Sequence, residues 1–121
     1  MSLDPCPDSP NCICSQADES DAQHFMQPIS YDGPADAALD AIATVIASAS
    51  GASISNRTNS QIDAVFVTRF FRFKDDVSFL VDSADSKIHF RSASRVGHSD
   101  LGANRKRLQS LVPQIKAKLA P

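Results

Sequence analysis

The first 56 residues of this 121-residue chain contain no lysine and no arginine. They carry eight acids, whereas residues 57–121 hold all 12 basic residues and the other six acids. The net charge of −2 therefore hides an acidic half of −8 and a basic half of +6. Such asymmetry favours attraction between the halves or an anionic partner for the basic half, although scattered surface charge gives the same totals.

Several signals of common function classes are missing. No run of about 18 apolar residues occurs, so no membrane span is predicted, and the opening MSLDPCPD lacks the basic and apolar regions of a signal peptide. There is no P-loop, G-x-G-x-x-G or H-E-x-x-H motif, so no cofactor is predicted. The isoelectric point of about 5.8 argues against a protein that binds nucleic acid. Phe70, Phe71 and Phe73 lie among basic residues, but most phenylalanines are expected in the core.

The three cysteines all lie in the first 14 residues. Cys6 and Cys12 can close a small loop across the turn-favouring segment PDSPN, which would fit an oxidising compartment and leave Cys14 unpaired. Alternatively, Cys6, Cys12, Cys14 and His24 can supply four metal ligands, or the thiols are incidental features of an exposed tail. The spacing matches no common zinc pattern, so no metal site is predicted.

Hydrophobic periodicity predicts the order α-β-β-β-β-α. A helical stripe runs from Ala35 to Ala49, with Asp32 or Gly33 as its cap, and a second helix begins at about Asp100 and is expected to kink or split at Pro113. Between them, alternation predicts strands over 52–57, 61–71, 77–83 and 87–95, joined by short connections that favour antiparallel pairing.

These elements predict an α+β fold, a two-layer sandwich with a four-stranded antiparallel sheet and two helices on one face. Residues 1–30 are expected to form an extended N-terminal arm, and residues 31–121 a single domain. Asp75 and Asp76 are expected in the turn before the third strand.

The stretch HFRSASRVGHSDLGANRKR, residues 89–107, joins the last predicted strand to the last helix. Arg91 and Arg95 point the same way, about 13 Å apart, and the helix N-terminus offers N–H groups that favour an anion. A guanidinium fork suits carboxylate or phosphate. The residues predicted to converge on an anion site at this corner are Arg69, Arg91, Arg95, Ser99, Asp100, Asn104 and Arg105.

A structural explanation of the same residues stays open. Asp75, Asp76 and Asp100 can pair with the arginines and lock the sheet to the helix, because ion-pair networks resemble sites. Ser99 is also a natural helix cap. The run His98, Ser99, Asp100 has the residue types of a hydrolase triad, but a triad is defined by spatial roles, which adjacency does not supply.

Three segments carry a family resemblance: CPDSPNC, FFRFKDDVSFLVD and IHFRSASRVGHSDLGANRKR. With them the chain resembles a family of small bacterial and chloroplast proteins of unknown function. The resemblance implies a single domain, commonly with a membrane-directing segment ahead of it, and no established activity. The longest and most specific signature of the family lies in the last of these segments. It covers Arg91, Ser92, Ala93, Ser94, Arg95, Gly97, Ser99, Asp100, Leu101, Gly102, Asn104 and Arg105. His98 and Cys14 depart from the family pattern.

Three functions follow as hypotheses. The first is a non-enzymatic module, expected at the cell envelope or periplasm, that binds an anionic small molecule, lipid headgroup or protein carboxylate at the corner. The second is a small hydrolase or isomerase that uses His98 or His89 with Asp100. The third is an assembly protein whose acidic arm docks on a neighbour's basic half.

Overall fold

The computed structural model describes residues 2–97 and 101–120. Its elements, in chain order, are β1 (Cys12–Cys14), β2 (Ile29–Ser30), α1 (Ala35–Ala47), β3 (Ala52–Arg57), β4 (Gln61–Val67), β5 (Lys74–Asp82), β6 (Lys87–Ser94) and α2 (Ala103–Leu119). This is the α+β class predicted from the sequence. Within the described residues, neither helix has the length and apolar character needed to cross a bilayer.

The sheet has six strands and not the predicted four. Its order is β1-β6-β5-β4-β3, all antiparallel, and β2 also pairs with β6. The two extra strands come from the N-terminal arm: Cys12 pairs with Ala93, and Ile29 pairs with Ile88. They cover an edge of β6 that would otherwise present unpaired N–H and C=O groups. Strands of two or three residues are too short to show a period in the sequence.

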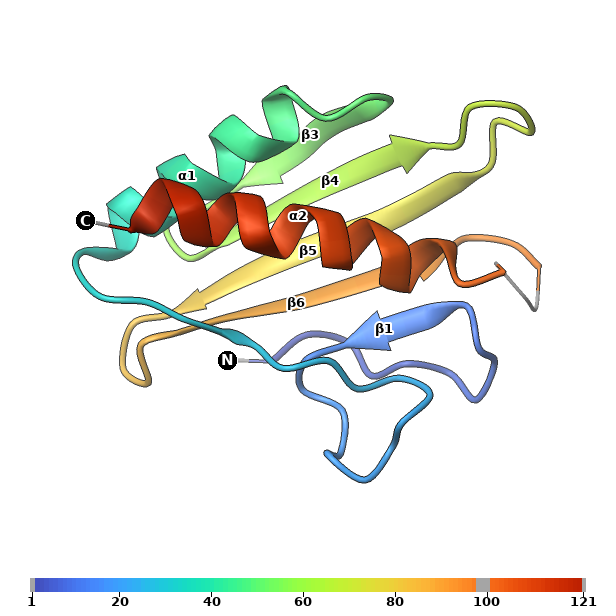
Figure 1. Ribbon diagram of the computed structural model, residues 1–121, viewed down its shortest axis with the longest axis horizontal. Helices are drawn as coiled ribbons and strands as arrows, with labels where there is room; N and C mark the ends of the chain where they lie inside the picture. The colour runs from blue at the N-terminus through green and yellow to red at the C-terminus, as the bar shows by residue number, and fades with distance from the viewer. Residues whose placement is uncertain (1, 98–100, 121) are drawn as a thin grey trace.

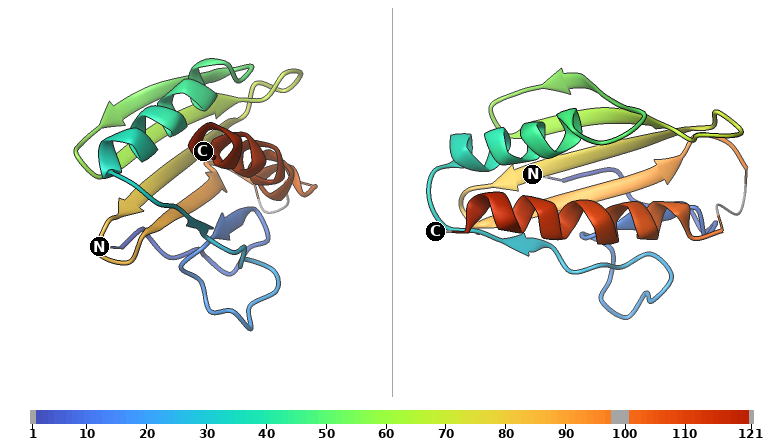
Figure 2. Two further views of the ribbon diagram at one scale, coloured as in Figure 1. Left: turned by 60° about the vertical axis from the view of Figure 1, so that its left-hand side comes forward. Right: turned by 45° about the horizontal axis from the view of Figure 1, so that its top comes forward.

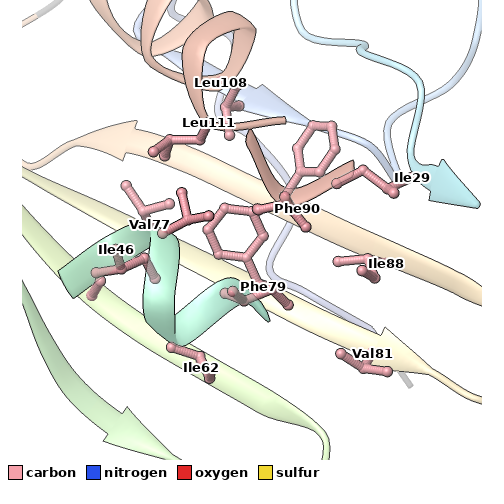
Figure 3. Close-up of a cluster of buried hydrophobic side chains, with 14 of the residues drawn as sticks. Ile29, Ile46, Ile62, Val77, Phe79, Val81, Ile88, Phe90, Leu108 and Leu111 are labelled. Carbon is pink, nitrogen blue, oxygen red and sulfur yellow. The ribbon is translucent and has the colours of Figure 1, made fainter. Parts of the chain in front are cut away.

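Both helices cover the same face of the sheet, as predicted (Figures 1 and 2). α1 packs over β3, β4 and β5, whereas α2 packs beside it over β6 and β1. Each helix buries one apolar stripe. In the core between the layers, the rings of Phe79 and Phe90 lie 6.3 Å apart at the centre of an aliphatic cluster (Figure 3).

The helix ends differ from the predicted ones. α1 starts after Pro34, in place of Asp32 or Gly33, and has no side-chain cap. α2 starts after Gly102, whose φ of 81° is accessible to glycine. The predicted caps Ser99 and Asp100 lie outside the described residues. α2 also runs through Pro113 without splitting, because the buried residues on both sides of the proline hold it against the sheet and α1.

The connection between β4 and β5 lies earlier than predicted. β4 ends at Val67, which pairs with Lys74, so Phe70 and Phe71 belong to the loop and not to the strand. The Thr68 N–H donates to the Phe73 carbonyl at 2.8 Å and closes this loop. Asp75 and Asp76, predicted as a turn, are strand residues of β5.

The N-terminal arm is packed on the domain and is not an exposed tail. Cys6 and Cys12 form a disulfide with Cα atoms 5.7 Å apart, and Cys14 is a buried free thiol. Within the described residues, no group of three or more His, Cys, Asp or Glu side chains is arranged to hold a metal. The division at residue 30 stays a prediction.

Candidate functional site

The sheet separates the arginines that were predicted to share one pocket. Ser92 of β6 bonds to Asn104 of α2, so it faces the helices. Because side chains alternate along a strand, Arg91 lies on the opposite face of the sheet. Asn104 and Arg105 lie on α2, on the helical side. Ser99 and Asp100, the other predicted members of this site, lie outside the described residues.

Arg95 and Arg91 meet protein groups on the face away from the helices. The Arg95 guanidinium binds Asp76 through two hydrogen bonds, Nε to Oδ2 at 3.0 Å and Nη2 to Oδ1 at 2.9 Å. This pairing raises the pKa of Arg95. Arg91 donates to the Pro5 carbonyl at 3.4 Å, and its buried Nε has no acceptor among the described residues. The hydrogen-bonding edge of the Arg95 guanidinium is therefore taken up by a carboxylate of the protein itself, that of Asp76.

Arg105 holds the N-terminal arm. Its guanidinium donates to the carbonyls of Ala22, Gln23 and Phe25 at 3.0 to 3.4 Å. Arg69 lies in the β4–β5 loop, with its guanidinium carbon 5.6 Å from the centre of the Phe70 ring. The structure therefore assigns these two predicted site residues to different environments.

Asn104 belongs to a buried polar network. Its Oδ1 accepts from the Ser92 hydroxyl at 2.6 Å and from Arg107 Nη1 at 2.9 Å. Its Nδ2 donates to the Asn11 carbonyl at 3.2 Å and to the Ser94 hydroxyl at 3.0 Å. One side chain thereby joins α2, β6 and the arm. Buried amides are stable only with such partners, since each unpaired one costs about 1–3 kcal/mol.

The centre of this network is the ion pair between Asp75 and Arg107, which sequence reasoning missed. Arg107 Nη2 lies 2.6 Å from Asp75 Oδ2, and the two side chains are 13% and 2% exposed. The guanidinium carbon of Arg107 also lies 5.0 Å from the centre of the Phe66 ring. The missed signal is the spacing of Asn104 and Arg107, which places both side chains on one face of the helix.

Five large apolar side chains are exposed at one end of the molecule. We call them the apolar tip: Phe70, Phe71, Phe73, Val96 and Leu101. Phe70, Phe71 and Leu101 are 84%, 77% and 88% exposed. Figures 1 and 2 show that the β4–β5 loop, the end of β6 and the start of α2 lie at the same end of the molecule. Phenylalanines expected in the core are therefore on the surface.

An apolar pocket of about 430 Å³ opens within the apolar tip. Phe71, Phe73, Val96 and Leu101 line it, and buried Asp75 lies in its wall. The Phe71 and Phe73 rings stack with centroids 5.5 Å apart. Such a pocket accepts the apolar part of a ligand or surface.

The backbone is strained at two places beside this pocket. Arg72 and Leu101 have φ values of 57° and 55°, a left-handed conformation that costs about 1–2 kcal/mol in a residue other than glycine. Neither residue is buried in the core. Strain of this kind tends to be retained at functional sites, but Ser86 in the β5–β6 turn has a similar φ of 53°. The two loops of the apolar tip are the stronger candidates because they combine this strain with exposed apolar side chains.

The two histidines that the structure describes, His24 and His89, make contacts within the protein. His89 Nδ1 lies 3.0 Å from the Ser15 hydroxyl, and burial lowers the pKa of His89 despite nearby acids. His24 Nδ1 lies 2.7 Å from Asp21 Oδ2, and its Nε2 lies 2.9 Å from the Ser9 carbonyl. Both ring nitrogens of His24 are thus occupied in holding the arm. His98 lies outside the described residues.

Comparison with protein families identifies the family to which the chain belongs. The model of a family described as protein of unknown function, DUF1499, matches residues 2–115. The chain belongs to the DUF1499 family. This family identity carries no activity. A search of curated proteins found no match to the chain.

The buried ion pair predicts a large difference between two adjacent aspartates. Asp75→Asn leaves the charge of Arg107 without its partner, and we expect the free energy of unfolding to fall by about 3 kcal/mol. Asp76→Asn breaks the exposed pair with Arg95, and we expect little change. Urea denaturation of both variants measures the difference. Equal effects would show that burial does not strengthen the first pair.

The contacts of His24 predict a pH dependence of stability. Burial lowers its pKa, but the Ser9 carbonyl and the Asp21 carboxylate outweigh burial, and the pKa is raised above 6.5. The stabilisation is therefore complete below pH 6.5 and lost as pH rises through the folded pKa. Melting temperatures of the protein and of His24→Gln, measured from pH 5.5 to 8.5, should converge as pH rises. A constant gap between them would contradict the shift.

Proposed function

We propose that this protein is a non-enzymatic binding module that attaches to the surface of an anionic lipid bilayer through its apolar tip. The observation that carries the proposal is the gathering of five of the six exposed large hydrophobic residues of the described chain at one end. The sixth, Ile54, lies on β3. Monomeric soluble proteins rarely expose large contiguous apolar patches, and those that occur mark interaction sites.

The charges beside the apolar tip suit an anionic surface. Arg69, Arg72 and Lys74 lie in or next to the β4–β5 loop, and none of the three has a carboxylate partner among the described residues. The neighbouring acids, Asp75 and Asp76, are each neutralised by an arginine. Each basic residue near an anionic membrane surface contributes about 1 kcal/mol of attraction.

The chemistry of the tip favours lipid over other partners. Two of its members, Val96 and Leu101, are aliphatic and cannot stack on a base. Phe71 and Phe73 stack on each other, which also removes ring faces from nucleic acid. Phenylalanine and leucine beside basic residues are typical of segments that lie in a bilayer interface.

Vesicle sedimentation tests the proposal. The full chain should sediment with phosphatidylglycerol-containing vesicles more than with pure phosphatidylcholine vesicles, and salt should weaken this binding because it screens the charges. Phe70→Ser/Phe71→Ser should lower the binding constant at least about tenfold, since each buried ring contributes roughly 1.5–3 kcal/mol. Ile54→Ser is the matched control, because it removes the exposed apolar residue outside the tip, and it should bind like the unaltered chain.

Three results would overturn the proposal. The unaltered chain would leave both kinds of vesicle in the supernatant, or the two phenylalanine changes would leave sedimentation intact. The third contradicting result is that the tip binds something other than vesicles: a second copy of the chain, seen as self-association in gel filtration, or a single-stranded oligonucleotide. Circular dichroism of the double variant checks that it is folded.

A further inference from the structure

A second cavity, of about 770 Å³, lies between the C-terminal end of α1 and the middle of α2. We call it the basic groove, because Arg69, Arg72 and Arg107 line it. Its described lining contains no carboxylate. Serine, threonine and glutamine side chains supply further hydrogen-bond donors around the arginines, namely Ser48, Ser50, Thr68, Ser110 and Gln114.

Arg107 is held rigidly with donor capacity to spare. A guanidinium has five N–H donors, and three hydrogen bonds fix this one to Asp75, Asn104 and Ser92. No described residue accepts from its Nε–H. Because these bonds already hold the Arg107 side chain in place where it lines the basic groove, orienting it costs little further entropy on binding. Pre-organisation of this kind strengthens binding because the ordering has already occurred.

Arg69 and Arg72 add charge that the protein does not neutralise. Both come from the β4–β5 loop, and neither forms an ion pair within the part of the chain that the structure describes. Asp75 offsets the charge of Arg107, so the groove keeps the charge of two arginines. The nearby end of α1 presents carbonyl groups, which repel anions. The arginine side chains must therefore carry any attraction for an anion.

We infer that the basic groove binds the phosphate group of a phosphomonoester. Planar guanidinium forks from two elements match the three oxygens and double charge of a terminal phosphate better than the two oxygens of a carboxylate. The groove is much larger than one phosphate, so the group is carried by a larger organic molecule. The same chemistry is offered by a soluble phosphomonoester and by a phosphatidate headgroup. The inference does not depend on insertion of the apolar tip into a bilayer.

Titration of the full chain with glycerol phosphate and with phosphatidate-containing vesicles tests the inference and separates the two sources. At least one probe should bind saturably. Arg69→Gln/Arg72→Gln should weaken that binding at least about tenfold, because it removes the charge-assisted hydrogen bonds of both guanidinium groups to the phosphate. Arg57→Gln is the matched control: it removes an exposed arginine outside the groove, paired with Asp40, and should change affinity less than about twofold.

A direct readout identifies the site in the folded protein. The Nε–H resonance of Arg107 in a nitrogen–proton spectrum should shift on addition of the probe that binds, in the unaltered chain and in Arg57→Gln. Phe70→Ser/Phe71→Ser should keep its affinity for glycerol phosphate if that probe binds, even where it has lost vesicle binding. The inference is overturned if neither probe binds, or if binding survives the loss of Arg69 and Arg72 unchanged.

Discussion

The buried ion pair between Asp75 and Arg107 connects the two surfaces that are proposed to bind, the apolar tip and the basic groove. Asp75 is the second residue of β5, directly after the β4–β5 loop, and Arg107 lies in the second turn of α2. Their contact therefore ties together the two chain segments that carry the apolar tip. Asp75 also borders the apolar pocket, while Arg107 borders the basic groove. One interaction positions both surfaces, and it tolerates burial better because Asn104 and Ser92 accept from Nη1 of Arg107.

The two cavities differ in the chemistry of their linings. Apolar side chains gather on one side of the ion pair and arginines on the other. An amphiphilic partner has the same two kinds of chemistry, and a bilayer surface with anionic headgroups presents both. Membership of the DUF1499 family assigns no activity to the chain.

The sequence predicted the class of the fold because helices and central strands are long enough to show a period. It did not predict β1 and β2, whose pairing depends on the exposed edge of β6. The error at Phe70 and Phe71 has a similar cause: alternation of apolar residues continues past Val67, but the backbone turns at Thr68. With that boundary misplaced, Asp75 was assigned to a turn and its partner Arg107 was overlooked. Partners 32 residues apart become visible only in the folded chain.

The most direct test of the account uses the absence of tryptophan from the chain. Phe71→Trp places a single fluorescent reporter in the apolar tip, and Ile54→Trp places one on β3. If the tip enters a bilayer, phosphatidylglycerol-containing vesicles should shift the emission of Phe71→Trp to shorter wavelength and leave that of Ile54→Trp unchanged. Emission of Phe71→Trp that stays at its wavelength in buffer, at saturating vesicle concentration, would contradict the account.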